Sequence, residues 1–250
     1  MNETVNILDI PFSKLTLNET TTFLTDHIEQ DDKLLHLVTV NPEIAINSEK
    51  DELLKKIILD ADMITPDGEG IVIASKRIGD PIKERVTGYE LLLKLLEKGN
   101  HFGWSFYFLG TDESTSYKAV ETIKNIYPNI KISGRHHGFF NESEEIQILK
   151  EIQKTKPNLL VIALGSPYSD KWIFKYKQQL SNVKVVFGVG GSLDVISGKV
   201  KPTPLIWKRL KLEWLFRLIV VPAGKGQKSR WRRQLALPKF FYRAIIKKGN

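Results

Sequence analysis

The sequence predicts an α/β protein whose body is a doubly wound, mostly parallel sheet with helices on both faces. Stretches with the apolar character of buried strands alternate with stretches of helical periodicity through residues 1–198. Several of the strand-like stretches are continuous apolar runs rather than alternating patterns, which is typical of parallel strands buried on both faces. Residues 199–250 differ in composition. They are expected to form a basic, helical C-terminal appendage.

The first half of the body begins with a buried strand, LLHLVTV, over residues 34–40. A helix is expected over 41–58, because the apolar residues recur with helical spacing and Pro42 suits a first helical turn. A short strand over 62–66 and a helix over 70–79 follow. The next helix is expected over 87–100, where Thr87 can cap the N-terminus and Gly99 lies near the C-terminal end.

The second half repeats this alternation. Strands are expected over 104–110, from 131 into a loop that ends near 140, over 158–165 and over 183–191. Helices are expected over 113–128, 143–157 and 169–180, the first of them ended by Pro128.

Composition limits the chemistry. The chain has 250 residues and no cysteine, which excludes disulfides and thiolate metal sites. Its five histidines lack the spacing of known zinc motifs, so no metal or other cofactor is expected. The N-terminus has no secretory signal pattern, and no apolar run approaches the roughly 20 residues of a membrane span. We therefore expect a cytoplasmic protein.

The charge is distributed unevenly along the chain. The net charge is +8, yet residues 199–250 contain 15 Lys and Arg against one acid, Glu213, which leaves 22 basic and 28 acidic groups in residues 1–198. A mildly acidic body with a strongly basic appendage indicates an anionic partner.

The turns that follow the expected strands are candidate ligand contacts, because ligands of such folds bind outside the carboxyl ends of the strands. These turns are Thr39-Val40-Asn41, Pro66-Asp67-Gly68, Leu109-Gly110-Thr111, Gly134 to Gly138, Leu164-Gly165-Ser166-Pro167, and Gly188 to Ser192. Most contain glycine, which lets the backbone approach a phosphate or a sugar. Turns of this kind use Gly, Asp and Asn for structural reasons too, but the whole set favours a nucleotide-type ligand.

Two short motifs have spacings close to those of cofactor-binding sequences. The segment GVGGSLD lacks the full glycine spacing of a dinucleotide fingerprint, and no strand with a terminal acid follows about 20 residues later, which disfavours NAD. A helix N-terminus that receives a nucleotide phosphate remains compatible with it. Asp60-Ala61-Asp62 has the DxD spacing of metal-bound sugar nucleotides but falls at an expected helix end, so we infer no metal from it.

The segment ITPDGEGIV (64–72) places Asp67 at a bend just after a short strand. One interpretation is a turn in which Asp67 caps the following helix. The other is a catalytic base held by the backbone geometry of a strand end.

The appendage has an amphipathic segment over 206–220 with Trp, Phe and Leu on one side and Lys and Arg on the other. This composition fits an anionic membrane surface, nucleic acid, or a helix packed on the body. It would also serve self-association into a homo-oligomer. A further hypothesis is that the chain is a nucleotide-binding module that docks on nucleic acid. This hypothesis is disfavoured because no nucleic-acid-binding signature accompanies the basic residues.

The order of the motifs NPEIA, ITPDGEGIV, RVTGYEL, FYFLG, GRHHGFF, ALGSP, GVGGSLDVISGKV and LEWLFRL resembles the WecG/TagA/CpsF glycosyltransferase family from about residue 36 to 233. The resemblance implies a Rossmann-like body, with an appendage that completes the active site at the inner face of the cell membrane. It implies a metal-independent, inverting transferase that moves N-acetylmannosamine from UDP to the C4 hydroxyl of N-acetylglucosamine on undecaprenyl diphosphate. That reaction begins the linkage unit of wall teichoic acid.

The same resemblance implies roles for individual residues. Asp67 matches the catalytic base, Thr39 and Asn41 a segment beside the sugar, and Arg85 a cation for the leaving group. Gly190, Gly191 and Asp194 match a segment near the nucleotide, and Ser169 occupies a substrate-contacting position. Other expected substrate contacts are Gly110, Gly138, Gly165, Arg217, Arg230, Arg232 and Arg233.

One departure puts the substrate in doubt. Where the family reads GSPKQE, this chain has Tyr168-Ser169-Asp170 after GSP, so Lys and Gln are replaced by Tyr and Ser. The alternative is therefore a related transferase that uses another UDP-sugar, such as glucose or a uronic acid, in capsule or exopolysaccharide synthesis.

Overall fold

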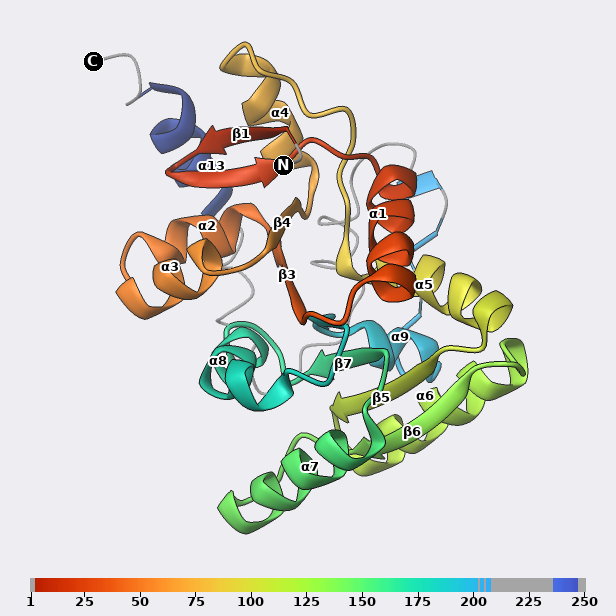
Figure 1. Cartoon of the computed structure of the whole chain (residues 1–250). Helices are drawn as coiled ribbons and strands as arrows, with labels where there is room; N and C mark the ends of the chain where they lie inside the picture. The colour runs from red at the N-terminus through yellow and green to blue at the C-terminus, as the bar shows by residue number, and fades with distance from the viewer. Residues whose placement is uncertain (1–2, 202, 205, 208–235, 247–250) are drawn as a thin grey trace.

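The computed structural model describes residues 3–201, 203–204, 206–207 and 236–246. Its centre is a six-stranded parallel sheet with the strand order β4-β3-β8-β7-β5-β6 (Figure 1). The strands are β3 (Leu35–Val40), β4 (Met63–Pro66), β5 (Ser105–Gly110), β6 (Lys131–His136), β7 (Leu159–Ala163) and β8 (Val185–Gly188). The predicted α/β fold with a doubly wound parallel sheet is confirmed.

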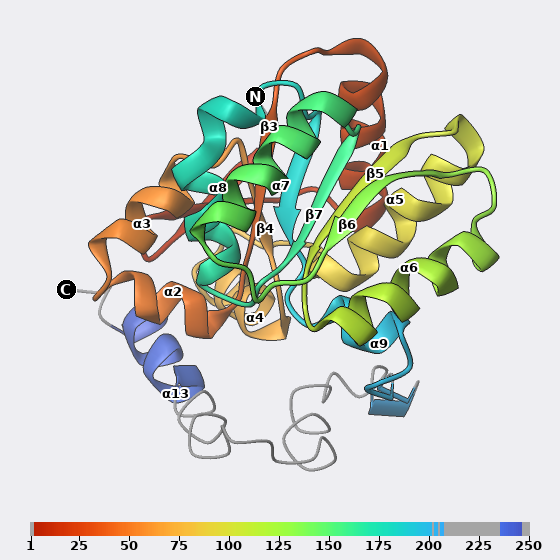
Figure 2. The same ribbon diagram turned by 90° about the horizontal axis from the view of Figure 1, so that it is seen from below.

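Helices cover both faces of the sheet, as Figures 1 and 2 show from two directions. One face carries α1 (Leu17–Gln30), α5 (Gly88–Phe102), α6 (Glu113–Ile126) and α9 (Ser192–Ile196), which bury a common cluster with the sheet. The other face carries α2 (Pro42–Ser48), α3 (Glu52–Leu59), α7 (Glu142–Thr155) and α8 (Tyr168–Tyr176), and a 3₁₀ turn, Lys177–Leu180, extends α8. Strand residues such as Phe106 and Tyr107 are fully buried on opposite faces, which explains the continuous apolar runs.

The β4 end of the sheet holds three further elements. An antiparallel hairpin of β1 (Thr4–Ile7) and β2 (Ile10–Ser13) shares a buried cluster with α4 (Glu69–Arg77) and with the C-terminal helix α13 (Ala236–Phe241). A π-helical turn, Tyr242–Ile246, follows α13. Within the described part of the chain, no helix is both long and apolar enough to cross a membrane.

The expected single helix over 41–58 is wrong in one respect, because the structure has two helices there. Helix α2 ends at Ser48, and α3 begins at Glu52. The side chain of Asp51 accepts a hydrogen bond from the N–H of Leu54 and so starts a new helix within the periodic pattern. Similarly, Gly103 in the left-handed conformation ends α5, whereas Gly99 lies inside that helix against Phe106.

The topology creates two places where the chain leaves neighbouring strands in opposite directions. After β5 it enters α6 on one face, and after the adjacent β7 it enters α8 on the other. After β3 and β8, likewise, the chain enters α2 and α9 on opposite faces. Such points open crevices outside the carboxyl ends of the strands, where ligands of this fold class bind.

Candidate active site

Asp67 lies directly after β4, at the carboxyl edge of the sheet. Its backbone N–H donates to the carbonyl of Val40 at 2.9 Å, which extends the pairing between β3 and β4 by one residue. The N-cap of α4 is Gly68, at φ 110°, and no side chain makes the capping hydrogen bond of that helix. Asp67 is therefore not the N-cap residue of α4, and its half-buried carboxylate stands on a turn tied to the end of β3.

Thr39 and Asn41 belong to the neighbouring strand end. Thr39 pairs in register with Thr65, and the first residue of α5, Gly88, lies so close that a Cβ there would be 3.6 Å from Thr39 Cγ2. Asn41 caps α2, since its Oδ1 accepts from the N–H of Ile44 at 2.9 Å. The NH₂ group of Asn41 takes no part in this cap and is suited to donate to a ligand.

Arg85 joins the helices on either side of the Asp67 turn. Its Nη2 donates to Glu90 Oε1 at 3.0 Å, and its Nε lies 3.7 Å from Glu69 Oε1. The N–H of Val86 donates to the carbonyl of Pro66 at 2.8 Å, which holds this segment beside β4. The Arg85 side chain is 17% exposed, and its guanidinium lies beside two carboxylates in the same strand-end region as Asp67, Thr39 and Asn41.

A second group of polar residues lies where β5 and β8 end. Asp194, in α9, accepts a hydrogen bond from the hydroxyl of Thr111 at 3.2 Å. The ammonium of Lys199 lies 3.4 Å from Asp194 Oδ1 and 2.6 Å from Asp112 Oδ2. Hydrogen bonds from Lys199 and Thr115 hold the pKa of Asp112 well below its ordinary value.

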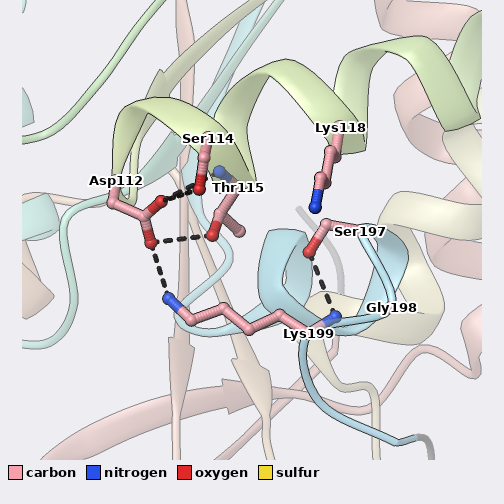
Figure 3. A pocket seen from close by; sticks show the side chains of 7 residues that line it. All are labelled: Asp112, Ser114, Thr115, Lys118, Ser197, Gly198 and Lys199. Carbon is pink, nitrogen blue, oxygen red and sulfur yellow. Dashed lines mark hydrogen bonds and ion pairs between the residues drawn. The ribbon is translucent and has the colours of Figure 1, made fainter.

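A cavity of about 320 Å³ opens beside this group (Figure 3). It lies between the first turns of α6 and the segment that follows α9. Its lining residues are Asp112, Ser114, Thr115, Lys118, Ser197, Gly198 and Lys199. Hydroxyl groups and ammonium groups of this kind are suited to a polar, anionic ligand such as part of a nucleotide.

Sequence reasoning did not single out Asp112 or Lys199. The available signal was position, since Asp112 follows the expected strand 104–110 by two residues and Lys199 is the first residue of the basic appendage. Their pairing joins residues 87 apart in the chain. A contact between residues so far apart cannot be predicted from a local sequence pattern.

The predicted glycines fall into two groups. A Cβ at Gly110 would meet the backbone of Ala163 at 2.4 Å, and one at Gly138 would meet Leu164 at 2.8 Å, so protein packing already requires these two glycines. Gly165 and Gly190 have positive φ with nothing within 4 Å of the Cβ position, which leaves their backbones accessible to a ligand. Gly191 lies 3.5 Å, measured in the same way, from Asp194 Oδ2.

Ser169 lies at the start of α8 behind the β7 loop. It is 2% exposed, and its hydroxyl accepts from the N–H of Leu164 at 3.1 Å. The next residue, Asp170, is 6% exposed, and burial raises the pKa of its carboxyl to about 6. The structure thus gives Ser169 a contact within the protein, and its contact with substrate stays a prediction.

The DxD segment is distant from this site. Asp62 precedes β4 and therefore lies at the amino ends of the strands, where its Oδ2 accepts from the N–H of His36. Lys177 pairs with Asp60 at 2.9 Å. Among the residues that the structure describes, no three acidic or His side chains gather as a metal site would require. The predicted contacts Arg217, Arg230, Arg232 and Arg233 lie outside the described residues.

Comparison with known proteins gives a consistent family. The model of the glycosyl transferase WecG/TagA/CpsF family matches residues 5–250. A Bacillus spizizenii protein is 34% identical over 94% of this chain and 88% of its own length. A Bacillus subtilis protein is 32% identical over 99% and 93%, and a Staphylococcus aureus protein 30% over 96% and 91%. All three are named N-acetylglucosaminyldiphosphoundecaprenol N-acetyl-beta-D-mannosaminyltransferase.

The resemblance expected from the ordered motifs is thereby confirmed over nearly the whole chain, including the C-terminal segment. With a parallel α/β sheet and polar strand-end turns as its framework, this chain belongs to the WecG/TagA/CpsF family of glycosyltransferases.

Proposed function

We propose that the protein transfers N-acetylmannosamine from UDP-N-acetylmannosamine to the C4 hydroxyl of N-acetylglucosamine on undecaprenyl diphosphate. The names of the relatives support this choice of sugar and acceptor. The structural observation that supports it is the hydrogen bond from the backbone N–H of Asp67 to the carbonyl of Val40, which holds the Asp67 turn beside the strand end that carries Thr39 and Asn41. We propose that the donor sugar and the acceptor hydroxyl meet between the Asp67 turn and this strand end.

The proposed reaction is a single displacement with inversion. The Asp67 carboxylate takes the proton of the acceptor C4 hydroxyl as that oxygen attacks the anomeric carbon. The bond between the anomeric carbon and the diphosphate oxygen breaks, and UDP leaves with the bonding electrons. Cations near the diphosphate stabilise the developing negative charge, a role proposed for Arg85 and for arginines of the appendage.

We propose that the nucleotide binds at the ends of β5, β7 and β8. Asp194 and the open backbones of Gly165 and Gly190 would contact it, and the cavity beside Lys199 would receive a polar part of it. The acceptor carries a long polyprenyl chain, so we propose that the protein works on the inner face of the cell membrane, with the basic appendage against anionic lipid.

A second candidate is transfer of another UDP-sugar to a polyprenyl-diphosphate glycan. It is favoured by one observation. Tyr168, which replaces the family's Lys, is 69% exposed at the start of α8, and Ser169, which replaces Gln, is buried. The Gln that the family resemblance implies as a substrate contact would then have no equivalent in this site.

The test is product formation with a short-chain N-acetylglucosaminyl diphosphate lipid and a panel of donors. UDP-N-acetylmannosamine, UDP-N-acetylglucosamine, UDP-glucose and UDP-glucuronic acid would be compared, with the product linkage determined by NMR. Disaccharide lipid from UDP-N-acetylmannosamine alone is the expected result. Turnover with a different donor would reject the first candidate and support the second.

A further inference from the structure

The C-terminal helix α13 packs on the elements that begin at two predicted catalytic turns. Helix α2 starts at Pro42, directly after Asn41, and Gly70 lies in the first turn of α4, three residues after Asp67. A Cβ at Gly70 would lie 2.6 Å from Pro42 Cγ and 3.3 Å from Leu237 Cδ2. Residues of α2, α4 and α13 therefore meet at one point beside both turns.

The rest of the C-terminal segment holds Leu237 in this place. Phe240 is fully buried, and Ala236 and Ala244 are nearly so, in the cluster that includes α2 and α4. Arg243 donates from Nη2 and Nε to Glu49 Oε1, at 2.6 and 3.1 Å. Since Glu49 is the C-cap of α2, this ion pair ties the C-terminal segment to the end of α2, and α13 lies beside α2 in Figure 2.

We propose that α13 is a positioning element for the transfer reaction, with Leu237 as the residue that fixes the spacing between the Asn41 and Asp67 turns. This inference rests on the proposed function only for the chemistry that the two turns perform. In this proposal Leu237 acts through its neighbours at the Gly70 position, Pro42 and the backbone of α4. A displacement of about 1 Å at a reacting group can reduce turnover by up to ~100-fold, so such packing has catalytic consequences.

The decisive comparison is Leu237→Ala against Ile245→Ala. Both residues are half-buried aliphatic side chains of the same C-terminal segment, but Ile245 is not among the atoms closest to Gly70. We expect Leu237→Ala to lower kcat by about 10- to 100-fold with the donor KM within about twofold. Ile245→Ala should lose a similar few degrees of Tm with kcat unchanged, and Leu237→Met should restore most of the activity. Equal kcat losses that follow Tm in the two Ala variants would overturn the proposal.

A charge exchange tests the second anchor. Arg243→Glu and Glu49→Arg should each reduce kcat, and the double variant should recover, because the pair and not either charge holds the segment. Failure of the double variant to recover, with a raised donor KM, would instead make Arg243 a substrate contact and overturn its positioning role.

Hydrogen exchange tests the positioning role of Leu237 without depending on which substrates the enzyme uses. The N–H of Ile44, bonded to Asn41, and the N–H of Asp67, bonded to Val40, report the two turns directly. In Leu237→Ala, peptides that span 41–48 and 67–75 should exchange at least about threefold faster, and in Ile245→Ala they should not. Faster exchange in an enzyme that transfers no sugar would keep the positioning role and reject the proposed function. Unchanged exchange would reject the positioning role.

Discussion

The ammonium of Lys199 lies 3.4 Å from the carboxylate of Asp194. Lys199 is the first residue of the basic segment, and Asp194 is a predicted nucleotide contact at the end of β8. The same ammonium lies 2.6 Å from Asp112, the N-cap of α6. The segment that leaves the body is therefore tied to two strand-end turns of the candidate site before it enters the appendage.

Replacing Lys199 is expected to weaken donor binding. In Lys199→Met, Asp194 keeps the Thr111 hydroxyl but loses its nearby cation, so its carboxylate is less well fixed. We predict a donor KM raised about 3- to 10-fold with kcat changed by less than about twofold, measured by initial rates. Lys201→Met, an exposed lysine two residues later, is the control and should behave as wild type. A wild-type KM in Lys199→Met would contradict the prediction.

The ion pair between Lys199 and Asp112 should also affect the stability of the protein at acidic pH. The folded-state pKa of Asp112 lies below its unfolded value, chiefly because of the Lys199 hydrogen bond. Its stabilising contribution is thus present above the unfolded pKa, near pH 4, and is lost as pH falls through the folded value. Lys199→Met should show a smaller fall of Tm than wild type between pH 5 and pH 3.

Asp67→Asn should fold normally and lose turnover. The substitution keeps the size of the side chain and the backbone hydrogen bond to Val40, but the amide cannot accept the acceptor's proton. A general base contributes about 10²- to 10⁴-fold, and we expect a fall of kcat in that range with Tm within a few degrees of wild type.

The control for Asp67 is Asp60→Asn at the opposite edge of the sheet. It removes one carboxylate of the DxD spacing, which pairs with Lys177 far from the candidate site. Its kcat should equal that of wild type with and without added Mn²⁺. A large loss in Asp60→Asn, or a near-normal rate in Asp67→Asn, would reject the assignment of roles.

Asp170→Asn is expected to stabilise the protein at neutral pH. Burial raises the folded pKa of Asp170 from 3.8 to about 6, so the folded state resists its ionisation. Stability associated with the protonated group is present below the unfolded pKa and is lost as pH rises through about 6. Urea unfolding should show a gain of about 1–3 kcal/mol for the Asn variant at pH 7.5 and little gain at pH 4.

Glu142→Gln is the matched control for Asp170. Glu142 lies in the first turn of α7 as Asp170 lies in that of α8, but its side chain is exposed. The control should not reproduce the pH-dependent gain. If Asp170→Asn loses stability at pH 7.5 instead, the carboxylate has a stabilising contact that outweighs the cost of its burial.

Gly110→Ala should be strongly destabilising, because an added Cβ would lie 2.4 Å from the backbone of Ala163 at φ 135°. We expect a loss of about 3 kcal/mol or more in urea unfolding. Gly79→Ala has positive φ without any neighbour within 4 Å, so it should cost only the roughly 1–2 kcal/mol of an unfavourable backbone conformation. Similar losses in the two variants would show that the β5 and β7 ends can separate to admit the methyl group.

Strands β3, β4, β5, β7 and β8 were predictable because they are largely buried on both faces and therefore read as apolar runs, whereas the edge strand β6, KISGRH, is only partly buried. The β1–β2 hairpin carried no such signal. Its strands have four residues each, and its turn uses Leu8 and Asp9 at positive φ rather than the Asn-Gly or Asp-Gly pairs that mark two-residue hairpin turns. Helix α1 begins with a capping box of Thr16 and Glu19, so the sequence does contain a start signal for this helix.

The strand-end positions of the candidate residues were predictable, but the contacts of their side chains were not. The strand-end turns identify Asp67, Asn41 and Asp194, because parallel strands bring their carboxyl ends to one edge. Which residue meets which depends on packing between distant segments. Thr111 and Asp194 are 83 residues apart, and Pro42 and Leu237, from opposite ends of the chain, both lie beside Gly70. The burial of Ser169 likewise follows from the β7 loop and not from its motif.

Membrane binding by the appendage is the last prediction. Truncation at residue 199 would remove Phe240 and Arg243 from their packed positions, so loss of function in such a variant would mix binding with stability. Neutralising charge avoids this problem. The variant changes three residues outside the described part of the chain, Arg230, Arg232 and Arg233, to Gln. Each basic residue near an anionic membrane contributes about 1 kcal/mol, so we expect binding to phosphatidylglycerol vesicles to weaken at least about tenfold.

The matched control changes three exposed lysines of the body, Lys33, Lys98 and Lys150, to Gln. It lowers net charge by the same amount and should leave vesicle co-sedimentation nearly unchanged. Wild-type binding should decline between 50 and 500 mM NaCl, since the Debye length falls from roughly 14 Å to about 4 Å over this range. Equal losses in the two triple variants would mean that net charge, and not the appendage, attracts the protein to anionic lipid.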